Sequence, residues 1–341
     1  MKRENIIIGI SAATAGIVSL EATLRMQYRR EKNRQFDREI RTSGRPWERF
    51  DQQSGWELKP GFANEDVSIG TKGFRGNNPS NTDSYRILCL GGSETFGPAG
   101  EKNTYPFSLQ QTLSSHRAAK PVEVVNAGVT GHATSNMVHR LHRLVRLRPD
   151  IVLIDAGWED IYAEPINTYV DKRLNFKSYW HYRDHDPNCS RLVSLVRRHI
   201  GKKTEPYELK YAPQEFVPFN FEYNLTRIIT AIRRMKARPI LLSIPEAFSD
   251  NISGDNGNTD KLPDFIMGQD IDALRTVYRS YDTIVRRVAE EKNAELIDIA
   301  ALLADTKEDG LFDNFRILSP KGNRVMGEYI ASYMLEQDLI P

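Results

Sequence analysis

The chain has few cysteines, few long hydrophobic runs and no marked excess of charge of one sign. Its two cysteines, Cys89 and Cys189, are too few for a disulfide framework. The net charge of +2 is too small to indicate a nucleic acid or another polyanion as partner. We also find no internal repeat. These absences favour one large globular domain with a modest appendage, built from 341 residues.

The only extended apolar run lies at the N-terminus. A positively charged start, Met1-Lys2-Arg3, precedes apolar or small residues from 6 to 20. This pattern is typical of a signal peptide or a short membrane anchor. As a helix the run would span about 22 Å, less than the ~30 Å of a hydrocarbon core. We predict a signal anchor over residues 1–24, with a cleaved signal peptide or an amphipathic soluble helix as the alternatives.

Residues 25–84 are expected to form a basic stalk and connector. The arginines and lysines that follow the apolar run favour a cytoplasmic position for that side of a membrane. From residue 35 the sequence is polar, poorly periodic and interrupted by Gly, Pro and Asn, which indicates irregular structure. Trp56 and Phe74 are expected to pin this connector against the domain.

Strands and helices alternate from residue 86 onward. Apolar runs predict strands at 86–90, 122–126, 150–155, 239–244 and 295–299. Apolar residues at helical spacing predict helices near 104–116, 134–147, 219–237, 271–292 and 320–336. The alternation predicts a parallel sheet with helices on both faces. Residues 162–218 interrupt it as an inserted cap, whose aromatic rings either stack on sugars or pack the cap itself.

The first predicted strand ends in Gly91-Gly92-Ser93. Glycines allow a sharp turn and leave room for a substrate beside the hydroxyl. Ligands of open α/β sheets bind at the carboxyl ends of the strands. Ser93 is therefore a candidate nucleophile, and the alternative is a helix N-cap.

Three later segments share this strand-end character. Asn126-Ala127-Gly128 ends the second strand, Gly157-Trp158-Glu159 ends the third, and the last runs from Leu311 to Asn323. Upstream lie Gly55-Trp56-Glu57-Leu58-Lys59-Pro60 and Gly73-Phe74-Arg75-Gly76. In order and spacing, these segments resemble the blocks of the SGNH (GDSL-like) hydrolase family over residues 86–335, in its membrane-anchored bacterial form.

The resemblance implies an α/β fold, a flavodoxin-like three-layer α/β/α parallel sheet over residues 85–341, with the insertion at 162–218 and an N-terminal membrane helix. Family members hydrolyse esters, often acyl groups on carbohydrates or lipids, without a cofactor or metal. The resemblance also places the domain on the periplasmic or extracellular side of a membrane. The basic residues after the apolar run favour the cytoplasmic side instead. We follow the resemblance and expect the domain on the periplasmic or extracellular side.

The same resemblance assigns roles to single residues. Ser93 is the nucleophile and the Gly128 N–H an oxyanion donor. Glu159 occupies the position where the family has an asparagine donor. The last block carries Asp313 at the acid position of the family's Asp-x-x-His. The chain has no histidine there, because that register puts Arg316 at the base position, and alignment on Leu318-Ser319-Pro320 gives Asn314 and Ile317 instead.

These departures bear on the chemistry. An ionised glutamate cannot donate a hydrogen bond to an oxyanion, and a guanidinium cannot act as a base. The base would then come from another histidine, His132, His181 or His185, or from a buried Glu159. His181 and His185 lie four residues apart beside carboxylates, but a solvated polar loop is favoured over a metal site.

The sequence therefore predicts a serine ester hydrolase with a nonstandard general base. Catalysis is expected from Ser93, Gly128, Glu159 and Asp313, and substrate contact from Gly92, Trp158 and His132. The expected substrate is an acylated carbohydrate or another ester. The alternative is a catalytically inactive relative that binds a glycan or assists envelope assembly.

Overall fold

A five-stranded parallel sheet forms the centre of the protein. The computed structural model describes residues 3–51, 53–80, 83–116, 119–163, 190–200, 212–246, 267, 270–306, 308–314 and 316–341. The strands are β3 (Tyr85–Gly91), β4 (Val122–Asn126), β5 (Ile151–Asp155), β6 (Arg238–Leu242) and β7 (Glu295–Ile297). Their order is β4-β3-β5-β6-β7, the flavodoxin-like order. All five predicted strands are confirmed, with shifts of one or two residues at some ends.

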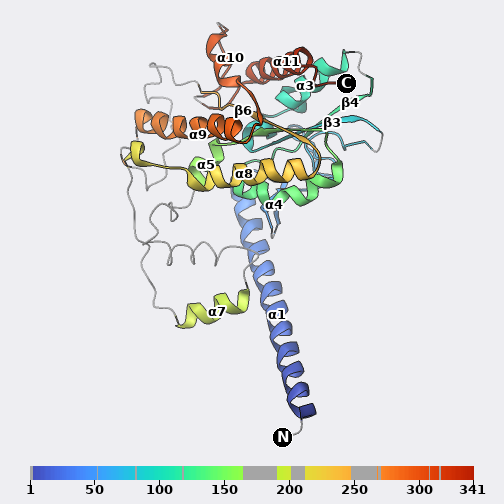
Figure 1. The fold of residues 1–341 in the computed structure, drawn as a ribbon, viewed down its shortest axis with the longest axis vertical. Helices are drawn as coiled ribbons and strands as arrows, with labels where there is room; N and C mark the ends of the chain where they lie inside the picture. The colour runs from blue at the N-terminus through green and yellow to red at the C-terminus, as the bar shows by residue number, and fades with distance from the viewer. Residues whose placement is uncertain are drawn as a thin grey trace.

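Helices cover both faces of this sheet (Figure 1). One face carries α3 (Tyr105–Ser114), α10 (Ile299–Asp305) and α11 (Pro320–Glu336). The other carries α4 (Thr134–Leu144), α8 (Phe219–Arg234) and α9 (Ile271–Glu291). The predicted three-layer α/β/α architecture is therefore confirmed.

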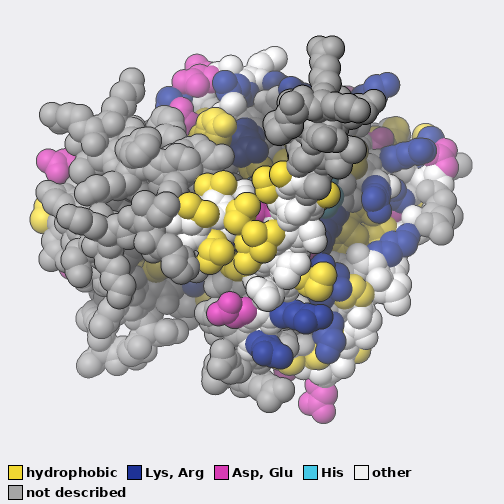
Figure 2. Space-filling model, turned by 90° about the horizontal axis from the view of Figure 1, so that it is seen from below, with side chains coloured by type: hydrophobic (Ala, Val, Ile, Leu, Met, Phe, Trp, Pro, Cys, Tyr) yellow, Lys and Arg dark blue, Asp and Glu magenta, His cyan; other side chains and the backbone are white. Residues whose placement is uncertain are grey.

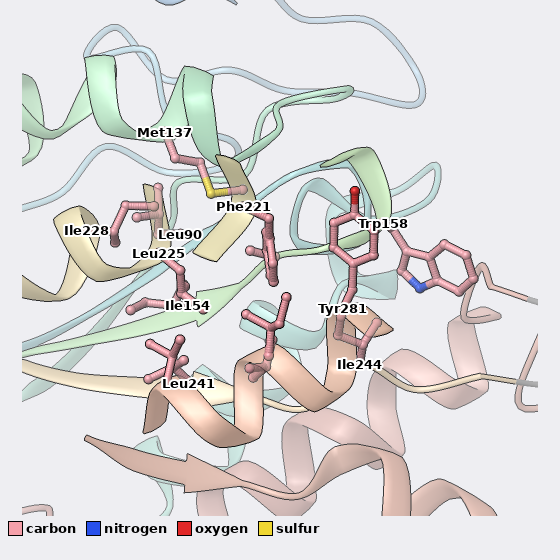
Figure 3. Close-up of a cluster of buried hydrophobic side chains, with 14 of the residues drawn as sticks. Leu90, Met137, Ile154, Trp158, Phe221, Leu225, Ile228, Leu241, Ile244 and Tyr281 are labelled. Carbon is pink, nitrogen blue, oxygen red and sulfur yellow. The ribbon is translucent and has the colours of Figure 1, made fainter. Parts of the chain in front are cut away.

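The apolar stripes of α4, α8 and α9 form the larger core with one face of the sheet (Figure 3). Phe221 and Leu225 of α8 and Tyr281 of α9 are at most 1% exposed, as are Leu90 of β3 and Ile154 of β5. Strands buried on both faces read as continuous apolar runs, which explains why they could be found in the sequence.

Short helices follow two neighbouring strands at their carboxyl ends. The first, α2 (Ser93–Phe96), follows β3, and α5 (Trp158–Ala163) follows β5. Because β3 and β5 pair directly, both short helices begin at the same edge of the sheet.

The structure describes only part of the predicted insertion. The described part contains α7 (Arg191–Ile200) and a 3-10 turn at Pro213–Glu215. Two further 3-10 turns lie outside the insertion, at Glu101–Asn103 and Val145–Leu147. His181, His185 and Cys189 lie outside the described residues.

The N-terminal helix is longer than predicted. Helix α1 runs over Arg3–Ser43, well beyond residue 24, and projects from the domain (Figure 1). The irregular structure expected from residue 35 is thus wrong for residues 35–43. Residues 25–43 are rich in Arg, Lys, Glu and Gln, all strong helix formers. Among the helices of the described residues, none is both long enough and apolar enough to span a bilayer. The structure therefore does not support the membrane helix predicted for residues 1–24.

The rest of the connector is folded onto the domain. Strands β1 (Glu48–Asp51) and β2 (Gly55–Leu58) form an antiparallel pair. The Trp56 Nε1–H donates to the Thr130 carbonyl over 2.8 Å, and Phe74 is buried in the main core. These two aromatic side chains hold the connector as predicted.

A buried ion pair adds to this attachment. Arg140 of α4 donates through Nε to Glu57 Oε2 of β2 over 3.0 Å, with side-chain exposures of 2% and 5%. Arg140 also donates to the Ala127 carbonyl, in the loop after β4. One guanidinium thus joins the connector, α4 and a loop at the carboxyl edge of the sheet.

Removing the charge of Glu57 should destabilise the protein strongly. Glu57→Gln leaves the buried Arg140 without a counter-charge, and breaking such a pair costs about 3–5 kcal/mol. Lys120→Gln is the control, because the Lys120–Asp83 pair is exposed on both sides and such pairs contribute little to stability. Urea unfolding measures both changes. Equal, small losses of unfolding free energy would contradict the structural role of the Arg140–Glu57 pair.

Candidate active site

Ser93 lies where β3 ends and α2 begins, at the carboxyl edge of the sheet. Two glycines make this turn possible. A Cβ on Gly92 would lie 2.7 Å from Glu159 Cγ, and one on Gly91 would lie 2.7 Å from the Asp155 carbonyl oxygen. Neither position has room for a side chain. Because both residues are glycines, the strand can turn tightly beside β5 and its short helix.

Glu159 of α5 is the direct partner of Ser93. The Ser93 backbone N–H donates to Glu159 Oε1 over 3.0 Å, and the Ser93 hydroxyl donates to the same oxygen. The Gly131 N–H donates to Ser93 Oγ over 3.0 Å. A carboxylate only accepts hydrogen bonds, so the hydroxyl proton lies toward Glu159. The Ser93 oxygen is thus held between a donor and a proton acceptor.

Arg316 lies beside Glu159, the partner of Ser93. Its Nη1 lies 3.5 Å from Glu159 Oε2 and 3.8 Å from Glu94 Oε1. The guanidinium also lies over the Trp158 and Tyr162 rings, 5.9 and 5.7 Å from their centroids. The guanidinium thus places a fixed positive charge beside the Glu159 carboxylate.

Three further carboxyl groups surround the site, and burial raises the pKa of each. The pKa of Asp155 rises to about 6 and that of Asp160 to about 7. Burial, and then the charges of Glu159 and Asp155, raise the pKa of Glu94 well above its ordinary value. Asp155 accepts from Thr95 Oγ1 over 2.8 Å, so it ties α2 to the end of β5.

Two recesses meet at Ser93. The first, the charged recess, has a volume of about 340 Å³ and is lined by Arg45, Ser93, Thr130, Gly131, Glu159, Tyr162 and Arg316. The second, the apolar cavity, has a volume of about 410 Å³. Its apolar lining comes from Pro46, Trp47, Val67, Phe96, Pro98, Ala99, Ile317 and Leu318. Ser93 and Thr130 line both, so a substrate at Ser93 can extend in two directions.

The matched region of the chain includes every strand-end segment of this site. Residues 89–325 match the model of the GDSL-like Lipase/Acylhydrolase family. The chain belongs to this family. The resemblance of its sequence blocks is thereby confirmed.

Solved structures of GDSL-like proteins are similar to the chain. A lipolytic protein of the G-D-S-L family from Desulfitobacterium hafniense shares 18% identity over 73% of this chain and 99% of its own, with a TM-score of 0.44. The lipase/acylhydrolase from Enterococcus faecalis shares 17% over 74% and 96%, with a TM-score of 0.45. A catalytic mutant of the acetylxylan esterase Axe2 from Geobacillus stearothermophilus shares 16% over 76% and 95%, with a TM-score of 0.43. No curated protein matches the chain.

This GDSL-like chain uses Gly128 for close packing. A Cβ at Gly128 would lie 2.6 Å from the Thr95 carbonyl carbon, so only glycine lets this loop contact α2. The Gly128 N–H donates to Asn126 Oδ1 over 2.9 Å. The donor that the resemblance assigns to the oxyanion is therefore engaged within the protein in this structure.

His132 and Trp158 are buried and line neither recess. His132 is 0% exposed, and its Nε2 lies 2.9 Å from the Trp56 carbonyl oxygen. Trp158 is 2% exposed and stacks on Tyr278 with ring centroids 4.2 Å apart. Both side chains are packed in the core, and their contact with substrate stays a prediction. The hydrogen bond of the His132 ring joins it to Trp56 and not to Ser93.

The last sequence block contributes differently from the prediction. Asp313 is exposed and lines neither recess, while its N–H donates to the Ile317 carbonyl. Arg316 lines the charged recess and Ile317 the apolar cavity. Both residues considered for the family's base position thus border Ser93. The signal for Arg316 was its position in the Asp313 register and its charge opposite to that of Glu159.

His132 should make the protein sensitive to acid. Burial, and then the charge of Arg140, lower its pKa to about 3, whereas an unfolded histidine titrates near 6.5. Between these values the unfolded chain binds more protons, so its stabilising contribution is complete above pH 6.5 and is lost as the pH falls toward 3.

The matched variant is His132→Gln, which keeps an N–H donor for the Trp56 carbonyl and removes the titration. Urea unfolding between pH 7.5 and 4.5 measures how the free energy of unfolding changes with pH. For His132→Gln this slope should be smaller than for the unmodified protein, by about 1 kcal/mol per pH unit in the lower half of the range. Parallel slopes would mean that His132 is already protonated in the folded protein.

Proposed function

We propose that this protein is a serine ester hydrolase in which Ser93 is the nucleophile and Glu159 the general base. One observation carries the proposal: the Ser93 hydroxyl donates directly to the Glu159 carboxylate, while the Gly131 N–H binds the same hydroxyl oxygen. A serine hydroxyl is a weak nucleophile unless a base takes its proton. Within the described residues, Glu159 is the side chain in contact with that proton.

The reaction begins with attack of Ser93 Oγ on the ester carbonyl carbon. The new O–C bond forms as the hydroxyl proton passes to Glu159 Oε1, and the carbonyl electron pair moves onto oxygen. Collapse of the intermediate breaks the bond to the alcohol, whose oxygen takes the proton from Glu159. Water then repeats both steps on the acyl-serine, and the acid is released.

Arg316 supplies positive charge for the oxyanion. The family's asparagine and histidine positions here hold Glu159 and Arg316, so the acceptor and the donor have exchanged places. The Ser93 N–H is bound to Glu159 in the resting site. A neutral carboxylic acid accepts hydrogen bonds less strongly than a carboxylate. Proton transfer therefore weakens this bond and frees the N–H for the oxyanion.

A second candidate is a non-catalytic binding protein of the same fold. The observation that favours it is that the Ser93 and Gly128 N–H groups both donate to side chains of this chain. A carboxylate beside the nascent oxyanion also opposes the charge that must develop there. In that case the site would hold a glycan without cleaving it.

An acylated carbohydrate of the cell envelope or an exported polysaccharide is the substrate we propose. The domain would then act outside the cytoplasmic membrane. Exposed apolar side chains on α1 and α7 support contact with lipid, namely Ile17, Val18, Leu20, Met26, Val193, Leu195 and Val196. The α1 side chain of Glu21 accepts from the N–H groups of Arg191 and Leu192, which joins the two helices. Figure 2, the view from the side toward which α1 projects, shows hydrophobic side chains gathered beside Lys and Arg.

Substitution of the two central residues tests the proposed chemistry. We expect the purified full-length protein to hydrolyse p-nitrophenyl esters, and Ser93→Ala to abolish turnover. Glu159→Gln should lower kcat by about 10²–10⁴-fold, because the amide cannot take the Ser93 proton. Steady-state kinetics at pH 7.5 measures both effects.

Asp313→Asn is the control, because the structure places this carboxylate outside both recesses. Its kcat should stay within about threefold of the unmodified value. If Glu159→Gln keeps full activity, Glu159 is not the base. If neither the unmodified protein nor Ser93→Ala exceeds the background rate, the non-catalytic alternative replaces the proposal.

A further inference from the structure

The apolar cavity next to Ser93 is large for an acetyl group. Its volume is about 410 Å³. By comparison, an apolar cavity of about 150 Å³ in another protein holds a benzene molecule. We propose that this cavity receives the acyl part of the ester, and that the acyl group is of hexanoyl or benzoyl size. This inference rests on the proposed function.

The direction of the ester follows from the position of Glu159. Glu159 lines the charged recess and not the apolar cavity. The alcohol oxygen must take its proton from Glu159 as it leaves, so the alcohol lies in the charged recess. The acyl group then extends to the other side of Ser93, into the apolar cavity. The polar lining of the first recess suits a hydroxylated alcohol such as a sugar.

The connector forms one wall of the apolar cavity. Trp47 stacks on Phe96 with ring centroids 5.9 Å apart and an interplanar angle of 15°. Val67 is 4% exposed and packs in the same cluster as Phe96. The opposite wall comes from Ile317 and Leu318. Aromatic and aliphatic side chains from three separate segments therefore line most of this space, as expected for an apolar ligand. The polar side chains of its lining are Asn64, Asp66, Ser93, Glu94, Thr130 and Asn323.

The chain-length profile of ester hydrolysis tests this inference. p-Nitrophenyl acetate, hexanoate and benzoate are compared by kcat/KM, each divided by its rate of alkaline hydrolysis. Burial of one methylene favours binding by roughly fourfold. The hexanoate and benzoate should therefore exceed the acetate by at least tenfold.

A cavity-filling variant locates the effect. Ala99 is an exposed residue of the cavity lining, so Ala99→Trp should reduce the hexanoate and benzoate values by at least tenfold and leave acetate within about twofold. Ala301→Trp, at an exposed position of α10 outside both recesses, should change none of them. A preference for acetate, or equal losses on all three esters in Ala99→Trp, would overturn the inference.

A binding measurement separates this inference from the proposed chemistry. Hexanamide and benzamide are neutral acyl analogues that need no turnover. Either should raise Tm of the full-length protein by a few degrees at millimolar concentration, whereas acetamide should not, and Ala99→Trp should remove the shift. If all esters remain uncleaved but this pattern holds, catalysis fails and the cavity assignment stands. If neither larger amide shifts Tm, the cavity assignment fails, whatever the esterase activity.

Discussion

The contact between Ser93 and Glu159 determines what this site can do. Ser93 ends one strand and Glu159 follows its neighbour, so the parallel pairing of β3 with β5 brings them together. Once a carboxylate occupies this place, nearby groups must compensate its charge. Arg316 does so directly, through its contact with Glu159. Burial and the neighbouring carboxylates raise the pKa of Glu94 well above its ordinary value, which opposes a further negative charge beside Glu159. If a histidine were the base at this place, its protonated form would lie beside a second cation, Arg316.

The connector before the sheet also shapes the site. Trp56, held by the Thr130 carbonyl, and Glu57, held by Arg140, attach it to the loop after β4 and to α4. The same segment brings Trp47 and Val67 to the apolar cavity. The part of the chain that precedes the hydrolase sheet thus helps to shape the site, and stability and specificity share one set of contacts.

Much of the fold and part of the site could be predicted from the sequence. The five strands are apolar on both faces and the five long helices carry clear apolar stripes, so both patterns were visible. Ser93 and Glu159 were found because each follows a buried strand. Helix α1 beyond residue 24 was missed, since its polar residues show no apolar stripe and only their helix propensity indicates a helix. The burial of His132 and Trp158 could not be predicted, because a position near a strand end does not say whether a side chain faces the cleft or the core. Trp47 carried no local signal, as only tertiary folding brings it to Ser93.

Covalent labelling of Ser93 is the most direct test that Glu159 activates it. An activated serine attacks the phosphorus of a fluorophosphonate and expels fluoride, and this labelling does not depend on later steps of ester turnover. The account predicts one label, on Ser93, and a labelling rate that falls by about a hundredfold or more in Glu159→Gln. An unchanged rate in that variant, or no labelling of the unmodified protein, would contradict the claim that this carboxylate serves as the base.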